Sequence, residues 1–129
     1  MKAPKMMLLA LLCSFGLAVS AQEKTTWKEQ EQFHGIMSKT FHPSEEGNFK
    51  PLKEKSDSLV IIAKQWKASK IPAGYKPKET AESIAKLLKQ CETVNAAVKS
   101  NKDEKTLGTL MFEAHETFHY IVGECKTHD

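Results

Sequence analysis

Apolar residues along most of this chain recur at spacings of three and four, which is the period of an α-helix with one buried face. Four segments show this pattern, and short stretches with proline, glycine or small polar residues separate them. We find no convincing period-two alternation of a half-buried strand. The pattern therefore predicts an all-α fold, an antiparallel up-down-up-down bundle of four helices.

The first predicted helix covers residues 25–41, where Trp27, His34 and Phe41 are seven apart, and it breaks at Pro43. The second begins with Pro51, because proline suits the first turn of a helix. N-caps are expected at Thr80 for the third helix and at Asp103 for the fourth. The stripes expected to face the core of the last three helices are Leu52, Ser56, Leu59, Ala63 and Trp66; Ile84, Leu87, Cys91, Val94 and Val98; and Leu107, Met111, Ala114, Phe118, Ile121 and Cys125.

The N-terminus has the pattern of an export signal. Lys2 and Lys5 precede an apolar run, and the small residues of "VSA" (19–21) suit cleavage before the next residue. We therefore predict a signal peptide at 1–21 and one four-helix domain at 22–129. The mature protein is expected in a bacterial periplasm or outside the cell, without a membrane anchor.

Charge argues against nucleic acid as a partner. Lys2 and Lys5 are two of 19 basic residues, so cleavage leaves a nearly neutral chain with 16 acidic residues. All the basic residues are lysines. Recognition of phosphate and nucleic acid usually relies on the guanidinium fork of arginine, which this chain lacks.

The last predicted helix contains "HETFH", with Glu116 between His115 and His119. This is the H-E-x-x-H spacing of zinc peptidases. In one such family, a glycine and a third histidine follow downstream, whereas Val122 and Cys125 stand at those positions here. The predicted fold also has no strand edge for an extended peptide. We therefore predict that the protein is not an enzyme, and that Glu116 is a solvated helix residue or a partner of a ligand.

The two histidines instead predict a metal site. Two neutral imidazoles at i and i+4 lie on one helical face, where a single ion can contact both. Because the first and last helices run antiparallel, equal rise per residue places His34 level with about residue 114. The heptad spacing of His34 directs it inward. The predicted metal ligands are His34, His115 and His119, with His42 as a fourth if the loop after the first helix folds over.

Other donors and a simpler interpretation stay open. Glu46 comes with His42 if the loop after the first helix folds over, and Cys91 is level with His115. The histidines are also compatible with a solvated position beside the apolar stripe. Cys91 and Cys125 are expected to remain reduced, because their predicted heights along the bundle are too different for a disulfide.

The chain from 27 to 125 resembles cytochrome c-prime, its low-spin relatives and the b-type four-helix cytochromes. The resemblance rests on the order of helices and turns and on "EEGNFKPLKEKSDSLVIIAKQWKASKIPAGY" (45–75). The last helix of that family carries C-x-x-C-H for covalent haem. Here His115 and Phe118 stand at the two cysteine positions and His119 at the axial histidine. Covalent haem is therefore excluded.

The resemblance implies either a haem-free relative or one that holds b-type haem without covalent links. In the second case His119 would be one axial ligand, and His34 or Met37 the other. Relatives of this fold often dimerise, although the sequence shows no exposed seam that would form a homodimer.

Three functions follow from the sequence. The first is binding of a transition-metal ion (zinc, copper or iron), for metal binding, sensing or electron transfer. The second is electron transfer by noncovalent haem. The third is a ligand-free structural or interaction protein.

Overall fold

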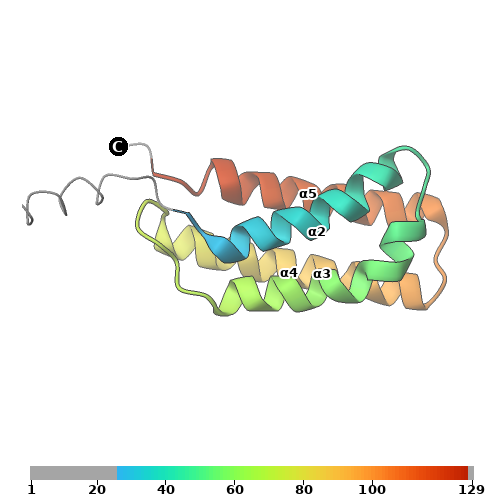
Figure 1. The fold of residues 1–129 in the computed structure, drawn as a ribbon, viewed down its shortest axis with the longest axis horizontal. Helices are drawn as coiled ribbons and strands as arrows, with labels where there is room; N and C mark the ends of the chain where they lie inside the picture. The colour runs from blue at the N-terminus through green and yellow to red at the C-terminus, as the bar shows by residue number, and fades with distance from the viewer. Residues whose placement is uncertain (1–25, 128–129) are drawn as a thin grey trace, which may run out of the picture.

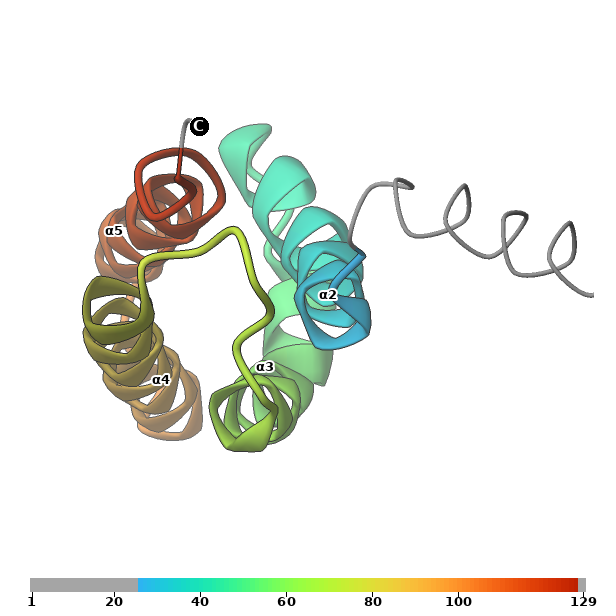
Figure 2. The same ribbon diagram turned by 90° about the vertical axis from the view of Figure 1, so that its left-hand side faces the viewer.

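The computed structural model describes residues 26–127, and within this range the chain forms an antiparallel bundle of four helices (Figure 1). They are α2 (Lys28–Glu45), α3 (Lys50–Ala68), α4 (Pro77–Lys99) and α5 (Glu104–Gly123). Each helix packs on the next, and α2 also contacts α5, which closes the bundle (Figure 2). The predicted all-α four-helix bundle is confirmed. The predicted signal peptide, residues 1–21, lies outside the described residues.

The predicted apolar stripes form the core. Every stripe residue expected on α3 and α5 is buried, including Ser56, whose hydroxyl donates to Asn95 Oδ1 at 2.7 Å. On α4 the stripe ends one residue earlier than expected, because Ala97 is buried and Val98 only partly so. Each fully buried leucine or isoleucine contributes about 1.5–3 kcal/mol, so these stripes are what hold the helices together.

An aromatic cluster around Trp66 joins three helices at one end of the bundle. The Trp66 ring centroid lies 5.6 Å from that of Trp27, 5.5 Å from that of Phe33 and 5.9 Å from that of Phe118. Trp27 Nε1 donates to Ser69 Oγ at 3.0 Å. Rings at these separations and tilts attract one another beyond their burial. The cluster fixes α2, α3 and α5 relative to one another.

The connection between α3 and α4 passes across this end of the bundle (Figure 2). Tyr75 in this connection donates from its hydroxyl to Gln30 Oε1 at 3.2 Å. The backbone N–H of Lys76 donates to the carbonyl of Cys125 at 2.8 Å. The segment after α5 is thereby attached to the α3–α4 connection.

Two of the predicted helix boundaries that differ from the structure lie at a proline. The first helix does not break at Pro43 but continues to Glu45, so the proline lies within the last turn of the helix. Its fixed φ is compatible with a helix. The third helix starts with Pro77 rather than near Thr80. Thr80 is fully buried and its hydroxyl has no hydrogen-bond partner, so it is not the N-cap.

Candidate metal-binding site

The four predicted histidines line one pocket of about 260 Å³ between α2 and α5. We call it the histidine pocket, and its ionisable lining residues are His34, His42, Glu45, His115 and His119. Helices α2 and α5 are far apart in sequence, and the antiparallel packing brings them together. The placement of His34 near the height of His115, predicted from equal rise along both helices, agrees with this pocket.

The two predicted ligands on α5 are in contact with each other. His115 and His119 are four residues apart, with ring centroids 4.4 Å apart and planes at 81°. An α-helix stacks positions i and i+4 on one face, so this proximity follows from the sequence spacing. Two imidazoles at this separation can provide nitrogens to a common ion.

His115 is the partly buried member of the pair. Phe41 stacks on it with ring centroids 3.8 Å apart and planes at 8°. Its Nδ1 is shielded from solvent and has no hydrogen-bond partner. Burial lowers the pKa of His115, and the neighbouring His119 lowers it further. The lowered pKa favours the neutral imidazole, which is the form that binds a metal.

His34 does not point inward as its heptad position predicted. It is exposed, and the adjacent Phe33 is fully buried in its place. The core stripe of α2 follows the spacing of Phe33, Met37 and Phe41, which leaves His34 at the edge of the helix. Its ring stacks on Phe118 with centroids 5.6 Å apart and planes at 12°, at the entrance to the histidine pocket.

His42 is exposed at the other end of the pocket, and its Nδ1 lies 3.4 Å from Glu45 Oε1. Sequence reasoning considered Glu46 as the accompanying carboxylate, but Glu45 lines the pocket and Glu46 does not. The signal for Glu45 was its i,i+3 spacing from His42, which the predicted break at Pro43 concealed. Cys91, an alternative ligand, is fully buried and does not line the pocket.

The predicted ligands line one pocket but do not form a complete coordination sphere. Within residues 26–127, no three His, Cys, Asp or Glu side chains are arranged to hold one ion. The α5 pair is in contact, whereas His34 and His42 have exposed side chains that can change rotamer. Binding would therefore require a rotation of at least one α2 side chain toward the α5 pair.

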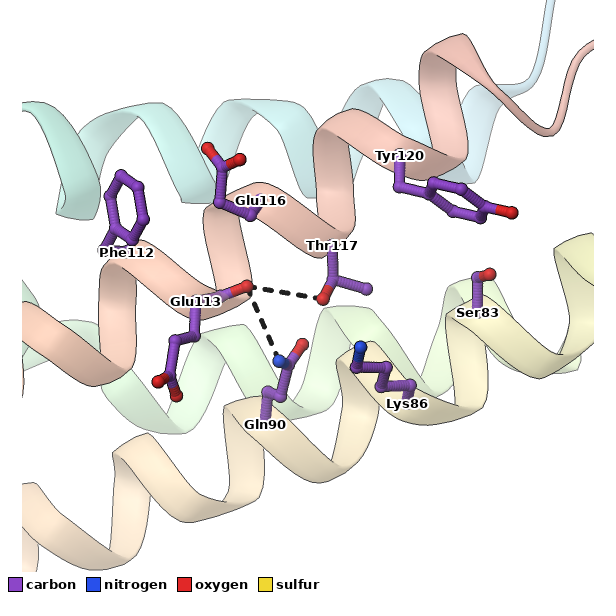
Figure 3. A pocket seen from close by; sticks show the side chains of 8 residues that line it. All are labelled: Ser83, Lys86, Gln90, Phe112, Glu113, Glu116, Thr117 and Tyr120. Atoms are coloured by element: carbon purple, nitrogen blue, oxygen red, sulfur yellow. Dashed lines mark hydrogen bonds between the residues drawn. The ribbon is translucent and has the colours of Figure 1, made fainter.

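Glu116, the central residue of "HETFH", lies in a different groove. It lines a groove between α4 and α5 together with Phe112 and Tyr120 (Figure 3). The two histidines instead line the pocket against α2. A general base in a zinc peptidase must reach a water on the metal. The placement of Glu116 gives no support to that role.

The histidine pocket is too small for haem in this arrangement. Sites for small organic ligands and cofactors usually span about 300–1,000 Å³, whereas this pocket has about 260 Å³. Phe41 covers the face of His115, and Met37 is 1% exposed. A macrocycle between α2 and α5 would have to displace both side chains.

In comparisons with protein families, curated proteins and solved structures, no match to this chain was found. Kinship with cytochrome c-prime therefore remains a hypothesis. In the part of the chain from 26 to 127, no helix combines the length and apolar character needed to cross a membrane.

Proposed function

We propose that the protein binds a single transition-metal ion at the histidine pocket, and that its role is metal binding, sensing or electron transfer. The observation that carries the proposal is the buried Nδ1 of His115, which lacks a hydrogen-bond partner. An unsatisfied buried polar atom costs about 1–3 kcal/mol. Reorientation of this imidazole around an ion would remove that cost.

His115 and His119 would supply the first two nitrogens, and α2 the third ligand. His34 and His42 are eight residues apart, about 12 Å along α2, so one ion would engage one of them. The ion would recruit His34 at one end, or His42 with Glu45 at the other. Imidazole donors suit zinc, copper, nickel and iron.

The test is the melting temperature of the purified protein with and without Zn²⁺, Cu²⁺ or Ni²⁺. A site built across two helices exists only in the folded state, so binding raises stability. At about 100 times the dissociation constant the gain is about 2.7 kcal/mol, or roughly 10 °C or more for a domain of this size. His119→Ala should abolish the rise.

Glu116→Gln is the matched control, because it changes α5 between the two histidines without touching their pocket, and it should respond to metal like the parent. Separate His34→Ala and His42→Ala variants identify the third ligand as the one whose loss weakens binding. If His119→Ala responds to every metal like the parent, the proposed site is wrong. A Soret band in the purified protein would favour haem instead.

A further inference from the structure

The surface formed by α4 and α5 carries two adjoining grooves that lie apart from the histidine pocket. The first has a volume of about 470 Å³ and runs between Phe112 and Tyr120, which stand at its two ends (Figure 3). The second, of about 440 Å³, shares Lys86, Gln90 and Glu113 with it. We call this surface, including both grooves, the α4/α5 face.

Two aromatic rings on this face are exposed and do not contribute to the buried core of the bundle. Phe112 is 55% exposed and Tyr120 is 44% exposed, although both are large apolar side chains. They are eight residues apart on α5, about 12 Å, and both line the first groove. Ile61, the third large apolar side chain exposed among the described residues, is isolated on α3. Clustered exposed apolar groups mark interaction surfaces, whereas single ones are ordinary.

The charges on the face are divided between its two helices. The α5 edge carries Glu113 and Glu116, and the α4 edge carries Lys86 and Lys89, together with Glu82. The α5 edge is therefore negative and the α4 edge net positive. Within residues 26–127, neither these two lysines nor the two α5 glutamates take part in an ion pair.

We propose that the α4/α5 face is the interface of a two-fold symmetric homodimer. A two-fold axis uses the same surface on both copies, so the surface must be self-complementary. Here the axis would place Glu113 and Glu116 of one copy opposite Lys86 and Lys89 of the other. The exposed rings of each copy would enter the grooves of the other.

The size of the face fits a modest dimer. Helix α5 has 20 residues, about 30 Å, and two adjacent helices are about 20 Å wide. The resulting area of about 600 Å² per copy is somewhat below the roughly 800 Å² that each partner of a standard interface buries. Because interfaces below the standard size are often weak, the dimer should form in a concentration-dependent way, which sedimentation velocity over a roughly hundredfold range of concentration measures.

Charge exchange tests the arrangement. One variant carries Lys86→Glu and Lys89→Glu, and the other carries Glu113→Lys and Glu116→Lys. In a dimer formed by either variant alone, like charges lie opposite each other at both edges of the interface. The dissociation constant of that dimer should therefore rise at least about tenfold. In a mixture of the two, each edge meets its opposite. The mixture should therefore recover association to within about threefold of the parent.

Phe112→Ser should also yield monomers without loss of helicity, because the ring is exposed in the single copy. Ile61→Ser, the matched change of an exposed side chain on α3, should leave the dimer intact. The proposal fails if the parent is monomeric at every concentration, if the mixed charge variants do not associate, or if Ile61→Ser disrupts association as strongly as Phe112→Ser.

Discussion

Phe33 and His34 are neighbours on α2, yet Phe33 is fully buried and His34 is exposed. The seven-residue spacing of Trp27, His34 and Phe41 predicted an inward histidine. Trp27, however, stands just before α2 as its N-cap, with an extended backbone, so it does not set the phase of the helix. The stripe that includes Met37 buries more apolar volume, and burial of apolar surface decides which face turns inward.

The surroundings of a single residue also determine the pKa of His115. His115 has a lowered pKa because of burial, so the unfolded chain binds its proton more tightly than the folded protein does. The metal-free protein should therefore lose stability as pH falls through about 6.5, the ordinary imidazole pKa. His115 contributes in full to stability only above that value.

We predict that metal affinity falls steeply with acid, because each coordinating imidazole must lose its proton to bind. Between pH 8 and 5 the dissociation constant, measured by isothermal titration calorimetry, should rise by more than tenfold per pH unit at the acidic end. That slope indicates more than one competing proton. A flat profile would show that carboxylate or sulfur ligands hold the ion.

At the scale of the elements, the start of a helix was predictable where a side chain caps it locally. Asp103 is the N-cap of α5, as predicted, and its carboxylate accepts from the N–H of Thr106 at 2.8 Å. Thr80 was predicted to cap α4 by the same reasoning. Pro77 at the start of α4 begins the helix three residues earlier, and Thr80 faces the core.

Asp103→Ala should lower the melting temperature of the protein, because the N–H groups at the start of α5 lose an acceptor. The hydrogen bonds from Thr106 lower the pKa of Asp103, so this contribution exists above the unfolded pKa of about 3.9 and disappears as pH falls through the folded value. Melting curves at pH 7 should separate parent and variant, and the curves should converge near pH 2. Asp103→Asn, which can still cap, is the control. Equal melting of all three at pH 7 would contradict the cap.

At the scale of the whole molecule, the end of the chain takes a path that helix counting did not predict. The predicted final helix reached Cys125, but α5 ends at Gly123. The following residues run beside the α3–α4 connection, where the N–H of Thr127 donates to the carbonyl of Gly74 at 2.8 Å. Gly74 has a φ of +97°, a conformation that glycine adopts without strain.

This path keeps the two cysteines apart. Cys125 Sγ lies 3.9 Å from Ser83 Oγ, and Ser83 precedes Cys91 by eight residues on α4. Eight helical residues span about 12 Å, and a disulfide requires Cα atoms within about 7 Å. Within residues 26–127, Cys91 and Cys125 are buried and form no disulfide, as predicted.

We therefore expect two thiols to titrate in the denatured, unreduced chain that starts at Gln22. In the native protein Cys91 should react slowly, since burial raises its pKa to about 12 and leaves almost no thiolate at neutral pH. A Cys91→Ala variant should show one thiol after denaturation. If the denatured monomer shows none, a disulfide exists and the path of the C-terminal segment is wrong.

The sequence by itself determined the bundle, its antiparallel order, the buried stripes of α3 and α5, and the contact of His115 with His119. Each depends on spacing along one helix or on short connections, and both are local properties of the chain. It also predicted that His34 would lie near that pair, because rise per residue is constant in every helix. His42 was expected there only if the loop after the first helix folded over.

Only the tertiary structure decided which way each α2 side chain faces, which carboxylate joins His42, and where Glu116 lies. These depend on the rotation of α2 and α5 about their own axes and on how closely the helices approach each other. The rotation of each helix is set by the packing of all four helices at once. The apolar pattern of one helix alone leaves that rotation uncertain by about one residue position. The stack of Phe41 on His115, and with it the unpartnered Nδ1 of His115, arises from that packing alone.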